Sequence, residues 1–345
     1  MNTMTLATIT DALTMTTLLS IGAFVMSMLL TPIYTYYAYR YKFWKRQRTT
    51  STTGELLKVF TKLHAHKFKR SIPTMAGIIG IVSIVIMTLA FNLDRAQTWL
   101  PLAALVGGGA IGMIDDIINI RGKQLGVAGL RSGLKFLLIT GLAAFLGWYF
   151  WSKLGFDAVH VPFWGSLELG WLIVPLFTLA VVSTSNAVNI SDGLDGLAGG
   201  LLGISFTTFG LIALLQGNIG IAGFCFTVLG ALLSYLWFNI QPARFYMGDV
   251  GSFAFGTALG VVAMLTDTLL LLPVIGMLFV LEAGSSLIQI VSKRFFGRKI
   301  FVSAPIHHHL EATGWPEAKV TMRFWVIGCI VGFLGIVMAL EGGVI

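Results

Sequence analysis

Residues 197–238 decide the fold class, and they read LAGGLLGISFTTFGLIALLQGNIGIAGFCFTVLGALLSYLWF. No Asp, Glu, Lys or Arg occurs in this stretch, and only Gln-Gly-Asn at 216–218 separates its two apolar halves. A helix that spans a membrane needs about 20 mostly apolar residues to cross about 30 Å of hydrocarbon. We therefore predict two consecutive membrane helices, over 197–216 and 218–238.

The rest of the chain has the same character. Of its 345 residues 56% are hydrophobic and 11% are charged, and its mean hydropathy of +0.85 exceeds what a water-soluble core requires. This composition excludes a soluble α/β enzyme and a disordered chain. Cys225 and Cys329 both lie in apolar runs, so we expect neither a disulfide framework nor a cysteine metal site. Further candidate helices lie near 17–39, 75–92, 97–114, 133–151, 169–188, 252–266, 268–291 and 322–340. We predict an all-α polytopic membrane protein, a single integral membrane domain over 1–345 with about ten transmembrane helices.

The basic residues predict the direction of these helices. All but two of the 23 Lys and Arg residues fall in or beside the connections at 40–72, 115–133, 239–252 and 292–321, and the exceptions are Arg95 and Lys153. Because Lys and Arg near helix ends stay on the cytoplasmic side, we expect these connections to be cytoplasmic and both termini to be extracytoplasmic. Removing one middle span would scatter the later charges over both faces, so the pattern also supports the helix count.

One segment of the basic 40–72 connection leaves two interpretations open. Between Glu55 and Lys69, apolar residues such as Leu56, Phe60 and Leu63 are interspersed with basic ones. A helix lying on the anionic inner leaflet and a solvated loop are both compatible with this pattern.

Five aspartates mark the cytoplasmic helix ends as a candidate site. Asp115 and Asp116 close the third predicted span, Asp192 and Asp195 precede the sixth, and Asp249 precedes the eighth. A single Asp at a helix start is commonly an N-cap, which is a serious alternative for Asp192 and a weak one for the pair that ends a span. Five carboxylates at one face would repel each other without a cation among them. A hard divalent ion bound by carboxylates and phosphate oxygens meets this requirement, so we predict Mg²⁺-assisted phosphoryl transfer.

His307, His308 and His309 form a second candidate cluster, within the predicted connection 292–321. Adjacent histidines cannot all point the same way, and zinc ligation favours spacings such as i, i+4, so a zinc site is a poor interpretation. Histidines suit contacts to phosphate or sugar oxygens and proton transfer. A polar turn before Gly-Trp-Pro at 314–316 is the alternative.

Four motifs occur in order along the chain. They are Ile-Asp-Asp at 114–116, Asn-Ala-Val-Asn-Ile-Ser-Asp-Gly-Leu-Asp-Gly-Leu-Ala at 186–198, Phe-Tyr-Met-Gly-Asp-Val-Gly-Ser at 245–252 and Ala-Pro-Ile-His-His-His-Leu-Glu at 304–311. Together they resemble the polyprenyl-phosphate N-acetylhexosamine-1-phosphate transferases, over about residues 73–325. The triple histidine is typical of the branch that transfers phospho-MurNAc-pentapeptide from UDP-MurNAc-pentapeptide to undecaprenyl phosphate, giving lipid I and UMP.

This resemblance implies a cellular setting and partners. It implies ten transmembrane helices in a bacterial inner membrane, an active site facing the cytoplasm, Mg²⁺ as cofactor and a step of peptidoglycan synthesis. The implied partners are undecaprenyl phosphate, UDP-MurNAc-pentapeptide, the lipid bilayer and a second copy of the chain, with no nucleic acid.

The resemblance also implies roles for individual residues. Asp115, Asp116, Asp249 and His309 match catalytic positions, and Asp249 and Asp192 match metal-binding ones. Substrate-binding positions are matched by Lys69, Lys135, Asn189, Asp192, Asp195, Asn239, Tyr246, His307 and His308. Residues 186–197 correspond to the nucleotide-side loop, where Asp195 would contact uracil, and 239–252 to the metal-site loop, where Tyr246 would stack on it. The family often carries Lys where this chain has Asn119, which predicts weaker donor binding unless Arg121 or Lys123 reaches the pyrophosphate.

Two other functions remain open from the sequence. A sister enzyme that uses UDP-GlcNAc shares most of the motifs, although the triple histidine argues against it. A secondary transporter would show repeated halves and mid-membrane charge. The chain has no visible repeat, and Glu282, inside the ninth predicted span, keeps this alternative open.

Overall fold

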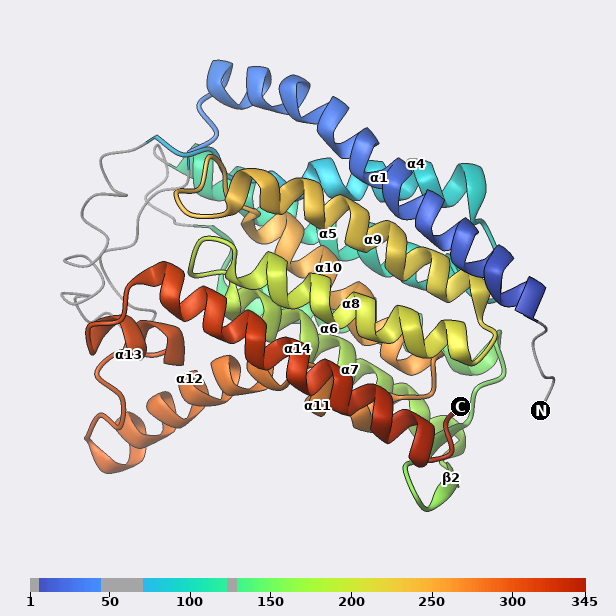
Figure 1. The fold of residues 1–345 in the computed structure, drawn as a ribbon. Coiled ribbons are helices and arrows are strands. Elements are labelled where there is room, and N and C mark those ends of the chain that lie inside the picture. Colours follow the sequence, from blue (N-terminus) through green and yellow to red (C-terminus); the bar gives the residue numbers. More distant parts are fainter. Residues whose placement is uncertain (1–5, 45–70, 123–128) are drawn as a thin grey trace.

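The computed structural model describes residues 6–44, 71–122 and 129–345, and this described chain is mostly helical (Figure 1). The α-helices are α1 (Leu6–Arg40), α4 (Gly77–Phe91), α5 (Trp99–Arg121), α6 (Ser132–Ser152), α7 (Ile173–Ser191), α8 (Leu197–Leu215), α9 (Ile219–Asn239), α10 (Gly248–Leu265), α11 (Leu272–Ile275), α12 (Met277–Phe296), α13 (Ile306–Ala312) and α14 (Glu317–Glu341). Two short 3-10 helices, η2 (Gly170–Leu172) and η3 (Leu269–Leu271), precede α7 and α11.

Eight helices of the described chain are long and apolar enough to cross a membrane: α1, α5 to α10 and α14. The predicted pair over 197–216 and 218–238 corresponds to α8 and α9, which the turn at 216–218 separates. The segment from Leu269 to Ile275 and helix α12 together pass the same test, but the chain bends by 80° between them. Helix α4 is apolar and only 15 residues long. A polytopic helical membrane fold is thus confirmed, and the count of ten, which needs both α4 and the bent pair to span, stays a prediction.

The helices extend into stretches that we predicted as connections. Helix α5 continues to Arg121, so Asp115 and Asp116 lie inside it, more than one turn of about 3.6 residues before its end. Helix α10 begins at Gly248 and places Asp249 in its first turn. The predicted connection 292–321 likewise contains α13. Apolar patterning does not extend over these residues, and their polar side chains contact other helices instead.

A β-hairpin departs from the all-α prediction. Strand β1 (Ala158–Val161) pairs antiparallel with β2 (Gly165–Glu168), and Ala158 lies opposite Glu168. Val159 and Val161 are β-branched, and Gly165 adopts a φ of +99° at the end of the turn. Four-residue strands carry too little pattern to be recognised within a chain dominated by long apolar runs.

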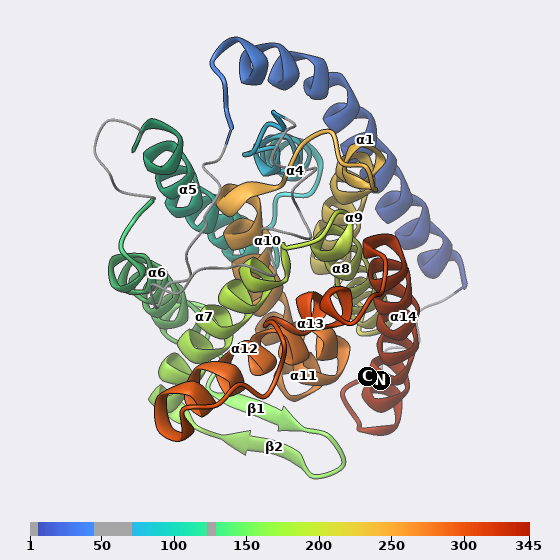
Figure 2. The same cartoon turned by 90° about the vertical axis from the view of Figure 1, so that its left-hand side faces the viewer.

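Helix α10 is the centre of the bundle, and all of its residues are buried. In the end view it is surrounded by α4, α5, α7, α8 and α9 (Figure 2). Gly112 of α5 lies against the backbone of α10 so closely that a methyl group there would overlap the carbonyl oxygen of Asp249. This contact brings the acidic end of α5 directly beside the start of α10.

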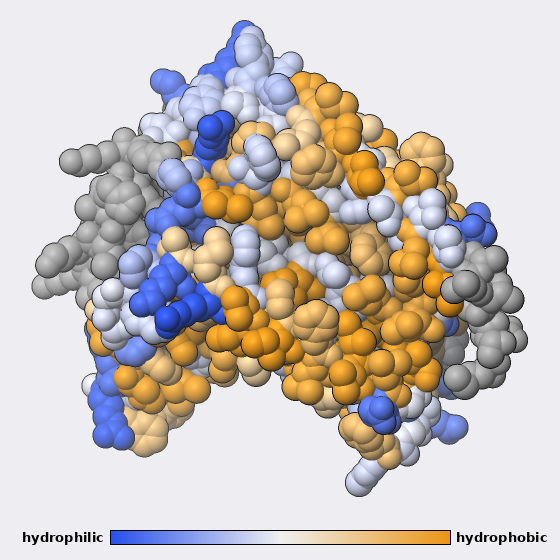
Figure 3. Space-filling view, in the orientation of Figure 1, coloured by the Kyte–Doolittle hydropathy of each residue, from blue (hydrophilic) through white to orange (hydrophobic). Residues whose placement is uncertain are grey.

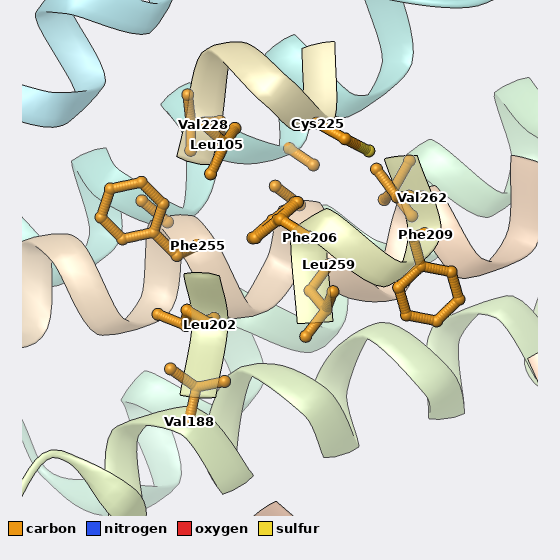
Figure 4. Close-up of a cluster of buried hydrophobic side chains, with 14 of the residues drawn as sticks. Leu105, Val188, Leu202, Phe206, Phe209, Cys225, Val228, Phe255, Leu259 and Val262 are labelled. Atoms are coloured by element: carbon orange, nitrogen blue, oxygen red, sulfur yellow. The ribbon is translucent and has the colours of Figure 1, made fainter. Parts of the chain in front are cut away.

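The apolar core lies where these central helices meet (Figure 4). Leu105 of α5, Val188 of α7, Phe206 of α8, Val228 of α9 and Phe255 of α10 are all almost completely buried there. Five helices are therefore fixed relative to one another by packing that does not involve the polar end of the bundle.

The outside of the bundle matches a membrane environment. Hydrophobic residues cover the middle of the visible face, and hydrophilic residues gather toward its two ends (Figure 3). The start of α1, the C-terminus and the β-hairpin lie at one end, and α13 lies at the other (Figure 1). The ends of the bundle therefore differ, and the candidate site occupies the α13 end.

Candidate active site

Three carboxylates meet where α5 and α10 touch. Asp115, Asp116 and Asp249 each offer an oxygen, and these oxygens lie within 4.8 Å of one another. The two α5 residues are fully buried and Asp249 is 7% exposed. Residues separated by more than 130 positions thus form one group, because the glycine contact described above allows α5 and α10 to approach closely.

Lys135 binds this acidic group from the first turn of α6. Its ammonium donates a hydrogen bond of 2.8 Å to Oδ2 of Asp115 and one of 2.6 Å to Oδ2 of Asp249. The same Nζ lies 5.3 Å from the ring centre of Phe253, within the range of a cation–π contact. The family resemblance implied a substrate-binding role for Lys135, and in the structure Lys135 bridges Asp115 and Asp249.

Backbone N–H groups also stabilise the carboxylates of Asp116 and Asp115. Oδ2 of Asp116 accepts the N–H of Val250 at 3.0 Å, so Asp116 caps the first turn of α10. Oδ1 of Asp115 accepts the N–H of Leu130 at 2.6 Å. The N-terminus of a helix carries partial positive charge, which favours carboxylates at this point. Lys135 and these N–H groups together stabilise the three acidic side chains.

The donor set fits an oxygen-ligated divalent cation. Carboxylate oxygens are the ligands that Mg²⁺ and Ca²⁺ prefer, and three of them lie close enough here to share one ion. Asp115, Asp116 and Asp249 could hold such an ion. Asp192, which the resemblance also implied as a ligand, lies outside this group in the turn after α7, and its role in metal binding stays a prediction.

The predicted nucleotide-side residues lie beside the acidic group. Asn189, near the end of α7, donates from Nδ2 to Oγ of Ser252 at 2.8 Å. Ser252 follows Asp249 by three residues and therefore lies one turn further along α10. Asp192 is half-buried immediately after α7. A hydrogen bond between polar side chains thus joins the end of α7 to the start of α10.

Asp195 and Asn239 are parts of the framework at this end of the bundle. Oδ2 of Asp195 accepts the N–H of Ala243 at 3.0 Å, and its own N–H is donated to Oε1 of Glu317 at 2.7 Å. The amide of Asn239 accepts the N–H of Gly196 and donates to the carbonyl oxygen of Phe245. These contacts join three connections, and the substrate roles of Asp195 and Asn239 stay predictions.

The three histidines lie on α13 and differ in their hydrogen bonds. Nδ1 of His307 lies 2.7 Å from Oε2 of Glu282, and Nδ1 of His308 lies 2.8 Å from Oε2 of Glu311. Nδ1 of His309 instead accepts the N–H of Val302 at 3.3 Å. A neutral His309 therefore carries its proton on Nε2 and can donate it, whereas a carboxylate next to Nδ1 favours the proton on Nδ1 in His307 and His308.

The remaining predicted residues are placed as follows. Tyr246 is half-buried, and its backbone pairs with Pro73 and Ala76. Lys69 lies outside the described residues. Asn119 is fully buried, and its side-chain amide has no hydrogen-bond partner within the described part of the chain. Glu282, whose role was open from the sequence, contacts His307, and Glu317, which was not among the predicted site residues, accepts the N–H of Asp195.

Comparison with known proteins identifies the class of protein. Residues 98–267 match the Glycosyl transferase family 4 model. The phospho-N-acetylmuramoyl-pentapeptide-transferase of Chloroflexus aggregans is 37% identical over 340 residues, which cover 94% of this chain and 90% of that protein. The enzyme of the same name from Geobacillus thermodenitrificans is 37% identical over 323 residues, covering 91% and 94%. That of Levilactobacillus brevis is 41% identical over 278 residues, covering 79% and 85%.

The chain is thus a membrane-embedded transferase, and its residues 98–267 are similar to glycosyl transferase family 4. More narrowly, the chain belongs to the phospho-N-acetylmuramoyl-pentapeptide-transferase family. The family resemblance inferred from the four motifs is confirmed, and the chain is a phosphotransferase. This membership favours the enzyme over the transporter as the interpretation of its polar residues.

Proposed function

We propose that the chain transfers phospho-MurNAc-pentapeptide from UDP-MurNAc-pentapeptide to undecaprenyl phosphate, giving lipid I and UMP in peptidoglycan synthesis. The observation that carries this proposal is the buried group of Asp115, Asp116 and Asp249 with Lys135 bound to it. Such a group combines oxygen ligands with an ammonium, as the transfer of a phosphoryl group from a pyrophosphate requires. Family membership supports the identity of the transferred group.

The proposed reaction needs little covalent chemistry from the protein. A phosphate oxygen of the lipid forms a bond to the β-phosphorus of the donor. The bond from that phosphorus to the bridging oxygen breaks, and UMP leaves with the electron pair. A lipid phosphate is already nucleophilic at neutral pH, so we favour one step over an aspartyl-phosphate intermediate. Asp115 orients the acceptor and takes its proton if the phosphate arrives singly protonated.

The positions of the polar side chains support this assignment of roles. Lys135 exchanges a carboxylate for a phosphoryl oxygen and stabilises the charge that moves to the leaving phosphate. Asp115, Asp116 and Asp249 would hold Mg²⁺, which when bound supplies positive charge to the pyrophosphate. The Nε2–H of His309 is a donor for phosphate or sugar oxygens.

We further propose that this end of the bundle faces the cytoplasm of a bacterial inner membrane. The basic connections support this orientation, because Lys and Arg gather on the cytoplasmic side. The start of α1 and the C-terminus lie at the opposite end (Figure 1), as ten spans would require. The family resemblance adds a homodimer to the proposal.

The test is a donor-choice assay. Membranes containing the chain receive undecaprenyl phosphate, Mg²⁺ and either UDP-MurNAc-pentapeptide or UDP-GlcNAc, and the release of UMP is measured. We expect turnover with the first donor only, and faster turnover with UDP-GlcNAc would favour the sister enzyme. Asp249→Ala should lower kcat by at least about 10²-fold, whereas Glu168→Gln on the exposed hairpin strand should leave kcat unchanged. A phosphorylated enzyme trapped from donor alone would contradict the one-step reaction.

A further inference from the structure

Helix α12 has a buried polar face that binds the segment before the histidines. Glu282, Ser285, Gln289 and Ser292 recur at helical spacing and are all buried. Three of them bond to the backbone of residues 298–306: Ser285 accepts the N–H of Ile306, Gln289 accepts the N–H groups of Ile300 and Phe301, and Ser292 donates to the carbonyl oxygen of Arg298. Polar residues that would be costly in lipid are thus used to hold this segment on α12.

Glu282 is the member of this face that bonds to a side chain of the candidate site. Its Oε2 lies 2.7 Å from Nδ1 of His307, and both side chains are fully buried. Its Oε1 has no hydrogen-bond partner within the described residues. A carboxylate that accepts from Nδ1 fixes both the proton position and the rotation of the imidazole, as it does for catalytic and metal-binding histidines.

The opposite edge of the His307 ring packs on the turn after α7. A methyl group built on Gly193 would overlap Nε2 of His307 and would lie 2.8 Å from its Cε1. Because Glu282 fixes the ring, the ring cannot move away from such a group. Gly193 lies between Asp192 and Asp195, so the distance from α12 to this acidic turn is set by one buried carboxylate and one imidazole.

We propose that Glu282 is a positioning residue that acts through His307 on the Asp192–Asp195 turn and thereby sets the affinity of the site for the uridine nucleotide part of the donor. This inference rests on the proposed function, which assigns that turn to the nucleotide side. Glu282 itself touches His307 and not the acidic group that binds the phosphates. Its loss should therefore affect binding of the nucleotide more than the chemical step.

The first test separates nucleotide binding from the chemical step. The Kd of UDP is measured by calorimetry on the full chain in detergent with Mg²⁺, together with kcat and both KM values. Glu282→Ala should weaken UDP binding and raise the donor KM about tenfold, the effect of about 1.4 kcal/mol. It should change kcat by less than about threefold and leave the KM of undecaprenyl phosphate unchanged. Glu282→Gln, which can still accept from His307, should stay close to the wild type. An unchanged UDP affinity in Glu282→Ala would overturn the proposal.

The second test asks whether Glu282 acts through His307 on Gly193. Gly193→Ala should weaken UDP binding about tenfold in the wild type, because its methyl group overlaps a fixed ring. In the Glu282→Ala background the ring can rotate, so the same change should cost less than about threefold. Additive losses would overturn the proposal. Gly284→Ala, on α12 with no atom within 4 Å of the new methyl, is the matched control.

These measurements also distinguish the two proposals. A wild-type chain that neither binds UDP nor releases UMP contradicts the proposed function. A wild-type chain that does both, with variants that keep its UDP affinity, contradicts the role of Glu282 alone. If Glu282→Ala does not fold, Gly193→Ala and Glu282→Gln still decide, because the inference requires the first to lose affinity and the second to keep it.

Discussion

Replacing Lys135 by methionine removes one charge from the acidic group and preserves most of the side-chain shape. The ammonium lies 2.8 Å from Asp115 and 2.6 Å from Asp249, and 17% of the lysine side chain is exposed. A hydrogen bond to a charged group contributes about 1.5–3 kcal/mol, and removing one partner of a buried ion pair costs about 3–5 kcal/mol. Because Lys135 is partly exposed, the cost should lie at the lower end of this range, and we expect the free energy of unfolding to fall by about 3 kcal/mol.

The same substitution should reduce catalysis, since Lys135 is proposed to bind the phosphoryl oxygens. We expect kcat/KM to fall by at least about 10²-fold, as for the loss of one preorganised donor. The assay is UMP release, with thermal unfolding in detergent measured on the same preparations. Lys153→Met is the matched control, because Lys153 lies just beyond the other end of α6 and its ammonium lies over the face of Trp148, 5.9 Å from the ring centre. A Lys135→Met variant whose kcat/KM and unfolding temperature equal those of the control would refute this account of the acidic group.

Three further predictions concern other parts of the chain. Gly112→Ala places a methyl group against the backbone of α10, so it should lower the free energy of unfolding by about 1–3 kcal/mol and also lower kcat. The control Gly141→Ala, which has open space around the new methyl group, should leave stability unchanged or raise it. Equal stabilities of the two variants would contradict the close contact of Gly112 with α10. Burial raises the pKa of the Asp267 carboxyl, against the N–H of His160 that lowers it. A raised pKa in the folded state means that the contribution of Asp267 to stability is present below its unfolded pKa of about 4 and is lost as the pH rises through the folded pKa. Asp267→Asn should therefore unfold at a higher temperature than the wild type at pH 7, with the difference vanishing toward pH 3, and an equal difference at both pH values would refute this pKa shift. Asn119→Lys should lower the donor KM in the UMP assay by adding a cation one turn beyond Asp115, and an unchanged or higher KM would show that the lysine pairs with the carboxylates instead.

The spans were predictable because the membrane imposes a length and a polarity on every helix. The run at 197–238 divides at 216–218 in the structure, as its polar break predicted. The ends of the helices were less predictable. Helix α5 passes through Asp115 and Asp116 to Arg121, because contacts to Lys135 and Val250 stabilise carboxylates that apolar patterning alone would exclude from a helix.

The acidic residues that gather at this end of the bundle were noticeable in the sequence, and their partners were not. Carboxylates at helix ends are rare enough in this chain to be noticed one by one. The partner of each group depends on contacts between residues far apart in sequence, such as Lys135 with the Asp249 carboxylate or the backbone N–H of Asp195 with Glu317. Glu282 was noticed as a charge within a span, but the sequence gives no direct sign that it faces His307.

The polar end of the bundle follows one physical rule. A carboxylate inside a membrane protein is stable only where a cation, a helix N-terminus or a hydrogen-bond donor meets it. Asp116 meets the start of α10, Asp115 and Asp249 share Lys135, and Glu282 meets His307. In the acidic group the partners include Lys135 and the N–H groups of Leu130 and Val250. Three carboxylates whose oxygens lie within 4.8 Å of one another can also be stabilised by a divalent cation, and the apolar core of five helices fixes the helices that carry them.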